Sequence, residues 1–274
     1  MPRRIADLDL EPRPIFAQHY VPRGPIADFV ELFWHWRGHS SPRSIERLLP
    51  MPTMELVFQL GGGQIGGGVA GPHSEVFFIE RSAQDELLGV HFKPGGAFPF
   101  LRMPAGDLHN RYVDLDDLWG ERDAALIAAQ LHEAPTSLAK FALLEDWLLR
   151  VAARPLARHP AATFALAELH RDSSVRSSAE VARTLGISQR RFIQLFRDEV
   201  GLTPKLYSRI ERFQLVLRRV ERVDDVDWID VATSCGYFDQ AHFIHDFREF
   251  TGLRPSDYLG LRIAGQRSHV RVPD

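Results

Sequence analysis

The sequence predicts an α+β protein, with a β-rich N-terminal barrel and flanking helices, then an all-α C-terminal domain containing two helix-turn-helix units. Short apolar segments separated by Pro, Gly and Ser clusters fill residues 15–92, which is typical of a small sandwich or barrel. From residue 94 onward, apolar residues instead recur at helical spacing. Near the C-terminus, a pattern of two helices joined by a glycine-containing turn occurs twice, in residues 178–201 and 230–252.

Length and composition indicate two soluble domains. The chain has 274 residues, which exceeds one typical domain. We expect an N-terminal domain at 1–153, a basic, Pro-containing linker at 154–160 and a C-terminal domain at 161–274. The single cysteine excludes an internal disulfide and a cysteine-based zinc cluster. Because no apolar run approaches the ~20 residues of a membrane span and no signal peptide is recognisable, we expect a cytoplasmic protein with no membrane partner.

The N-terminal half is expected to contain five strands, at residues 16–21, 32–36, 54–60, 76–79 and 87–92. Residues 1–14 are rich in Pro and Arg and are expected to form a loose arm. The glycine run at 61–68 superficially resembles a phosphate loop. It lacks a Gly-Lys-Ser/Thr ending and a following helix, so we expect a hairpin turn or a mobile loop there.

Helices are expected to follow at residues 95–101, 104–108, 122–132 and 136–153, and another at 161–170. One stripe of the 136–153 helix carries Leu138, Phe141, Leu144, Leu148 and Val151. Such a stripe is either intramolecular core or a surface for a second copy of the chain. Both interpretations stay open from the sequence, and a homodimer is expected.

Each C-terminal repeat has the same skeleton of a short apolar helix, a Gly break, a cap and a second apolar helix. In the first copy these are Val181, Ala182 and Leu185, then Gly186, then Ser188, then Phe192, Leu195 and Phe196. In the second copy they are Ile229, Ala232 and Cys235, then Gly236, then Asp239, then Phe243, Phe247 and Phe250. The repetition predicts helix-turn-helix units at about 178–200 and 227–251, each placing its second helix in the DNA major groove.

A helix from Pro204 to about Val220 separates the two units. It would be ~25 Å long at ~1.5 Å per residue. A rod of that length can hold two recognition helices near the ~34 Å repeat of successive major grooves. One chain is therefore expected to bind two neighbouring boxes of double-stranded DNA.

The run Ala182-x3-Gly186-Ile187-Ser188-Gln189-Arg190 and the run GYFDQAHF at 236–243, closing on Gly252-x2-Pro255-Ser256-x-Tyr258, resemble the AraC/XylS family of bacterial transcription regulators. The resemblance covers about the last third of the chain. It implies promoter binding, contact with RNA polymerase and control by a small-molecule effector. Residues 88–97 more weakly resemble the strand-to-helix junction in cupin-like effector domains of this family, whose ligands are largely unassigned.

Eight residues outside the apolar stripes are the candidate DNA contacts: Gln189, Arg190, Ile193, Gln194, Gln240, Ala241, His242 and His245. Arg190 can fork onto guanine, Gln onto adenine, and an aliphatic side chain can contact a thymine methyl. The alternative is that these residues form a solvent-exposed helix face and do not contact DNA. The family usually has a basic residue where Gln194 stands on the first helix, and commonly Arg where His245 stands on the second. Because of His245, the second helix is expected to contribute less to sequence recognition or to contact phosphate alone.

No catalytic, cofactor or metal site is expected. Cys235 falls on the apolar face of its helix and reads as a small core residue. The N-terminal histidines His19, His35, His39, His73 and His91 lack a metal-binding pattern, and the effector-binding residues are unknown. The net charge of −3 indicates modest, salt-sensitive DNA affinity. Two alternatives stay open: a cupin-like enzyme or DNA-repair methyl acceptor fused to a DNA-binding module, and a ligand-independent DNA-binding dimer.

Overall fold

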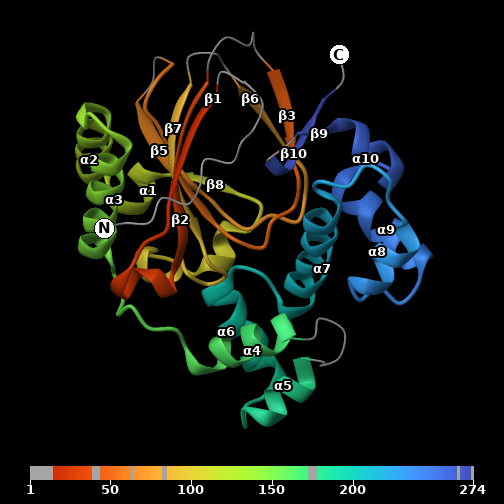
Figure 1. The fold of residues 1–274 in the computed structure, drawn as a ribbon. Helices are drawn as coiled ribbons and strands as arrows, with labels where there is room; N and C mark the ends of the chain where they lie inside the picture. Colours follow the sequence, from red (N-terminus) through yellow and green to blue (C-terminus); the bar gives the residue numbers. More distant parts are fainter. Residues whose placement is uncertain are drawn as a thin grey trace. The chain divides into compact units, whose positions relative to one another are not determined.

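The structure, a computed structural model, describes residues 15–38, 44–62, 65–81, 85–171, 178–263 and 266–272 (Figure 1). The expected N-terminal arm and His39 lie outside these residues. The chain forms two compact units. The first unit comprises Met1–Ser44, Thr53–Gly71 and Arg81–Ala157, and the second comprises Ile45–Pro52, Pro72–Glu80 and Arg158–Asp274. Two segments that the sequence analysis assigned to the N-terminal domain therefore lie in the second unit.

The first unit is built on a six-stranded antiparallel sheet of order β1-β2-β7-β4-β5-β8. Its strands are β1 (Ile15–Tyr20), β2 (Val30–Gly38), β4 (Glu55–Gln59), β5 (Gly66–Ala70), β7 (Glu86–Phe92) and β8 (Tyr112–Asp114). The β-rich character predicted for the N-terminal half is confirmed. In this order β1 and β8 are the edge strands, so closure into a cupin-like barrel stays a prediction.

The last three residues of the glycine run, Gly66–Gly68, lie in a strand and not in a turn or loop, and residues 63–64 of the run lie outside the described residues. The structure places Gly66–Ala70 in β5, which pairs along its length with β4. A Cβ at Gly68 would lie 2.3 Å from the Tyr112 ring, and one at Gly67 would lie 2.7 Å from the Val57 carbonyl oxygen. Only glycine permits this close packing. The glycines that suggested a loop are therefore required by the packing of a strand.

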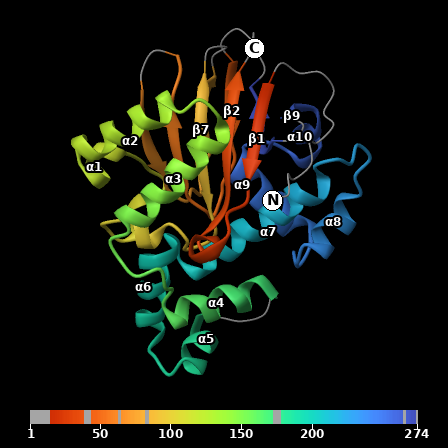
Figure 2. The same ribbon diagram turned by 60° about the vertical axis from the view of Figure 1, so that its left-hand side comes forward.

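Helices cover one face of this sheet. Figure 2 shows α2 (Glu121–Glu133) and α3 (Ser137–Val151) lying across it, with α1 (Leu115–Trp119) at one side. Three short 3₁₀ turns complete the unit: η1 (Gly24–Asp28), η2 (Phe98–Phe100) and η3 (Ala105–Leu108). The predicted apolar stripe of α3 is wrong at Leu138, which is 62% exposed. Trp147, which was not predicted to belong to the stripe, is buried. The core-facing stripe of α3 therefore runs through Phe141, Leu144, Trp147 and Leu148.

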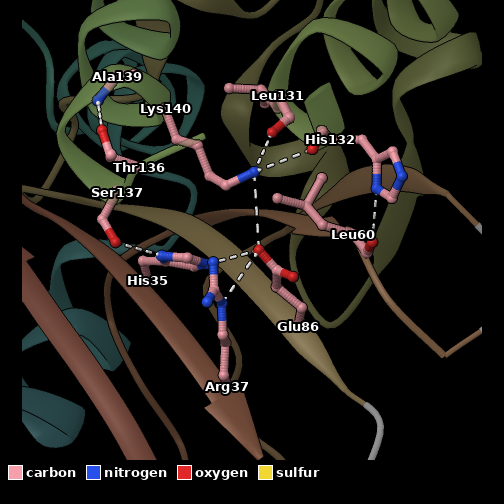
Figure 3. A network of polar contacts seen from close by, with 10 residues as sticks. All are labelled: His35, Arg37, Leu60, Glu86, Leu131, His132, Thr136, Ser137, Ala139 and Lys140. Carbon is pink, nitrogen blue, oxygen red and sulfur yellow. Dashed lines mark hydrogen bonds and ion pairs between the residues drawn. The ribbon is translucent and has the colours of Figure 1, made fainter. Parts of the chain in front are cut away.

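A polar network lies between the sheet and the α2–α3 hairpin (Figure 3). The fully buried ring of His35 lies 2.9 Å from Glu86 Oε1 through Nε2 and 2.7 Å from Ser137 Oγ through Nδ1. Burial lowers the pKa of His35 below its ordinary 6.5, even though Glu86 favours the protonated ring. The ring is therefore neutral at pH 7. Its Nε2–H donates to Glu86, and Nδ1 accepts from the Ser137 hydroxyl.

Lys140 joins the same network from α3. Its ammonium group donates to the carbonyl oxygens of Leu131 and His132 at the end of α2, and lies 3.7 Å from Glu86 Oε1. A cation is favourable at a helix C-terminus, where unpaired carbonyls concentrate partial negative charge. Since Lys140 itself is buried, these partners offset the cost of removing its charge from water. The network thereby fastens both helices to β2 and β7.

The second unit is helical, as predicted, but also contains a small sheet. Its helices are α4 (Pro160–Arg171), α5 (Ser178–Thr184), α6 (Gln189–Val200), α7 (Pro204–Val220), α8 (Trp228–Ser234), α9 (Gln240–Thr251) and α10 (Pro255–Leu261). Figure 1 shows α4, α5 and α6 grouped toward one end of α7, and α8, α9 and α10 toward the other. None of the helices in the described part of the chain is long and apolar enough to cross a membrane.

The sheet of the second unit has the order β6-β3-β10-β9 and was not predicted. Its members are β3 (Ser44–Leu48), β6 (Phe77–Arg81), β9 (Arg262–Ile263) and β10 (Gln266–Arg271). Strand β3 pairs antiparallel with β10, with Arg47 opposite Val270. Leu49 and Val270 are fully buried in the helical core. A segment from the N-terminal half of the chain is therefore part of the core of the second unit.

Candidate DNA-binding surface

The first helix-turn-helix unit consists of α5 and α6, joined by a turn at Gly186. This residue has a φ of 67°, a left-handed conformation that suits glycine. The backbone N–H of Ile187 returns to the Ala182 carbonyl at 3.1 Å and closes the turn. Ser188 then caps α6, since its side chain accepts a hydrogen bond from the Arg191 N–H at 3.2 Å. The predicted break and cap are both confirmed.

The second unit repeats this construction with α8 and α9. Gly236 has a φ of 81°, and the N–H of Tyr237 returns to the Ala232 carbonyl at 3.0 Å. Asp239 caps α9 by accepting from the His242 N–H at 2.7 Å. This confirms the predicted capping role of Asp239, whose carboxylate is directed to the helix end.

The buried face of α8 differs from the prediction in one residue. Ile229, expected on that face, is 61% exposed, whereas Val231 is 6% exposed. The reason is the cap: Asp227 accepts from the N–H groups of Ile229 and Asp230, so α8 begins at Trp228. An inward stripe at i, i+3, i+4 and i+7 then consists of Trp228, Val231, Ala232 and Cys235.

The predicted contact residues lie on the outer faces of α6 and α9. On α6, Gln189, Arg190 and Gln194 are exposed and Ile193 is partly buried. On α9, Gln240, Ala241 and His245 are exposed and His242 is partly buried. Of the apolar residues expected beneath them, Leu195 is only partly buried. The others lie in the core: Phe192, Phe196, Phe243, Phe247 and Phe250. Each helix therefore presents one polar face and packs the other, as a recognition helix must.

Two cations on these faces were missed from the sequence. Arg197 on α6 and Arg248 on α9 are exposed and occupy matching positions, four residues before the glycine that ends each helix. Aligning the repeats from Gln189 and Gln240 to Gly201 and Gly252 would have revealed the pair. Exposed arginines beside a recognition face are suited to phosphate contact.

The second recognition helix is tied to α7 by one arginine. The Arg209 guanidinium donates to Asp246 at 2.7 Å and to Glu249 at 2.8 Å, and it lies 5.0 Å above the Phe250 ring. Asp246 is almost completely buried, so this partner offsets the cost of its charge. The hydrogen bond from Arg209 lowers the pKa of Glu249, so this carboxylate remains ionised at pH 7.

The same carboxylates and His245 have ligand atoms within 4.8 Å of one another, a spacing that a metal ion could use. The Arg209 nitrogen already contacts both carboxylates there. A positive charge is therefore supplied by the chain itself.

Each recognition helix is also held near its C-terminal end by a segment from earlier in the chain. Glu199 of α6 is buried and accepts from the His159 N–H at 3.0 Å, where the expected linker ends. On α9, the Thr251 carbonyl accepts from the Arg47 guanidinium at 2.8 Å. These hydrogen bonds hold the C-terminal ends of α6 and α9 and leave the outer faces of both helices exposed.

Cys235 lies at the end of α8 and is 6% exposed. Burial raises the pKa of its thiol above the ordinary value. The reactive thiolate is therefore disfavoured, in agreement with the predicted core role.

Two capped helix-turn-helix units on either side of one long helix define a tandem helix-turn-helix domain. Comparison with known proteins identifies its type. The family description "Helix-turn-helix domain", of the AraC type, matches residues 181–260, which confirms the resemblance predicted from the sequence. A second description, "Domain of unknown function (DUF6597)", matches residues 18–114.

Individual proteins are also similar to parts of this chain. "Probable transcriptional regulator LumQ" of Photobacterium leiognathi is 31% identical over 83 residues, which are 30% of this chain and 33% of that protein. This chain thus spans about a third of the length of that relative. Among solved structures, a DNA-binding transcriptional dual regulator from Escherichia coli K-12 is 24% identical, covers 38% of this chain and 94% of its own, and has a TM-score of 0.32. ToxT from Vibrio cholerae is 10% identical, covers 90% and 98% of the two chains, and has a TM-score of 0.44.

Proposed function

We propose that the protein is a bacterial transcriptional regulator that binds promoter DNA through α6 and α9. The observation that carries this conclusion is the duplicated, equivalently capped turn that exposes a polar face on each of these helices. A single helical hairpin occurs in many proteins, but two units flanking one long helix are suited to binding two successive major grooves. Because bacterial promoter DNA lies in the cytoplasm, this function implies a cytoplasmic protein.

The base contacts are assigned to the N-terminal half of each recognition helix. On α6 these are Gln189, Arg190, Ile193 and Gln194, and on α9 they are Gln240, Ala241, His242 and His245. Arg190 is exposed and is suited to a bidentate contact with guanine. Gln194 donates to Asp198 at 2.7 Å, so it must exchange this intrahelical bond for a base contact. Arg197 and Arg248 are assigned to phosphates.

The β-rich unit is assigned to effector sensing or homodimerisation. The domain boundaries proposed here are those expected from the sequence, except for two segments of the N-terminal half. The DNA-binding unit also includes segments 45–52 and 72–80. An effector that shifts the sheet of the first unit would act on the recognition helices through these segments as well as through residues 154–160. Changed presentation of the DNA-binding unit would then alter contact with RNA polymerase.

The enzyme alternative has little support in the geometry. A methyl acceptor needs an accessible thiolate, whereas Cys235 is buried and its pKa is raised by that burial. We therefore assign no catalytic residue and no cofactor.

Titration of the purified full chain with duplex DNA, followed by fluorescence anisotropy, tests this proposal. We expect saturable binding that weakens steeply as salt increases from 50 to 200 mM, because phosphate contacts release counterions. Absence of duplex binding, together with a tightly bound metal in the purified protein or alkylation of Cys235 by methylated DNA, would favour the enzyme alternative.

A further inference from the structure

The two helix-turn-helix turns differ in length by one residue. Ile187 and Tyr237 are equivalent, because each closes its turn with the same hydrogen bond to an alanine carbonyl in the preceding helix. In the first unit the capping residue, Ser188, follows at once. In the second unit Phe238 stands between Tyr237 and the cap. Phe238 therefore has no counterpart in the first unit.

The additional residue is also the most exposed large apolar side chain in the described part of the molecule. Phe238 is 92% exposed, compared with 61% for Ile229 and Phe78, whereas its neighbour Tyr237 is buried. The backbone of the turn does not require a ring here, because Phe238 has no left-handed φ and contributes nothing to the buried aromatic cluster of the second unit. An isolated phenyl ring in water is unfavourable until another apolar surface covers it.

The position of the ring within the unit indicates what that surface is. Phe238 immediately precedes Asp239, the cap of α9, and the exposed Gln240 and Ala241 follow in the first turn. In helix-turn-helix proteins the N-terminal residues of the recognition helix enter the major groove and contact base edges. A side chain projecting from the preceding turn then lies at the mouth of the groove. The apolar groups available there are thymine methyls and deoxyribose carbons.

We propose that Phe238 is a DNA-contacting residue of the second unit, whose ring packs against an apolar edge of the duplex at the second box. This inference rests on the proposed function, because it requires α9 to enter the major groove. It also gives the second box an anchor that does not depend on hydrogen bonding. The anchor complements a helix whose exposed face carries Ala241 and His245 where the first helix carries Arg190 and Gln194.

The test compares Phe238→Ala with wild type on the tightest duplex recovered from random DNA, using full-length protein and anisotropy. We expect about tenfold weaker binding, the effect of removing a buried aromatic contact. Phe238→Leu should retain much of the affinity. Leu215→Ala, which truncates an exposed residue of α7, serves as the matched control and should bind like wild type. Unchanged melting temperatures would confirm that the variants fold.

A second arm distinguishes the two apolar groups. Thymines of the second box are replaced one at a time by deoxyuridine, which lacks the methyl group. If one replacement weakens wild type but leaves Phe238→Ala unaffected, the ring packs on that thymine; if none does, it packs on deoxyribose. Wild-type affinity for Phe238→Ala, on a duplex where Arg190→Ala is weakened, overturns the inference alone. Failure of wild type to select any duplex overturns the proposed function with it.

Discussion

The Arg47 guanidinium of β3 donates a 2.8 Å hydrogen bond to the Thr251 carbonyl, at the last residue of the second recognition helix. These residues are 204 positions apart in the chain. The bond satisfies a carbonyl that has no partner within the helix, and it places a cation at the negative end of the helix dipole. Strand β3 therefore helps to orient α9.

Replacing Arg47 by Met should weaken binding at the second box while leaving the first box intact. The variant loses a charged hydrogen bond worth about 1.5–3 kcal/mol and keeps the aliphatic stem. Footprinting on a two-box duplex measures each box separately. Arg271→Met, which removes an exposed cation from the neighbouring strand β10, is the control. Equal weakening of both boxes would show that Arg47 supports the fold in general and does not position α9.

A fragment of residues 158–274 should not fold as a stable DNA-binding domain. It lacks Leu49, which is fully buried in the helical core, and the Pro50 carbonyl that accepts from Gln214 at 2.6 Å. Circular dichroism melting is expected to show a broad, non-cooperative transition. In the full chain, Leu49→Ala should cost about 2–5 kcal/mol of unfolding free energy. A cooperative melt with full DNA affinity from the fragment would contradict this prediction.

Much of the second unit could be predicted because its signals are local. Helix caps such as Ser188 and Asp239 lie next to the turns they stabilise, and the phenylalanines repeat at helical spacing. The predicted inward face of α8 is wrong at Ile229, because the Asp227 cap starts the helix at Trp228 and leaves Ile229 exposed.

The unpredicted elements depend on partners far along the chain. Strand β3 is five residues long and pairs with β10, more than 200 residues later, so no local pattern marks it. Strand β5 is glycine-rich because its neighbours leave no room for side chains. From composition alone, a glycine-rich segment of this kind is predicted to be a loop. The network of His35, Glu86 and Lys140 likewise joins two strands and a helix that only the fold brings together.

Arg190→Ala should reduce affinity for the cognate site by about 1–3 kcal/mol and relax specificity at one base position. The exposed guanidinium can form two hydrogen bonds with guanine, which no other base satisfies equally. Arg197→Ala is the matched comparison on the same helix and should weaken binding to all sequences alike, with a smaller salt slope. Affinities for a panel of single-base variants separate the two roles. If Arg190→Ala lost affinity uniformly, its assigned role would be that of a phosphate contact.

Stability should decrease as pH falls below 6.5, because burial holds the pKa of His35 below that value in the folded protein. The unfolded chain then binds a proton that the folded chain does not, which favours unfolding. Glu86, whose pKa is lowered, adds to this loss only below pH 4.5. Burial also lowers the pKa of His19, which adds a loss of the same sign. The contribution of His35 is therefore obtained by comparing the urea unfolding of wild type and a His35 variant between pH 7.5 and 5. His35→Asn should flatten the dependence, and a variant with the pH dependence of wild type would contradict this prediction.

The central claim is that one chain reads two boxes with α6 and α9. Selection of bound sequences from random duplex DNA by the full-length protein tests it most directly. We predict a recovered motif with two boxes about one helical turn apart. We also predict that Arg190→Ala degrades only one box and Phe238→Ala only the other. Enrichment of a single box in wild type, or enrichment of no sequence at all, would contradict the tandem reading.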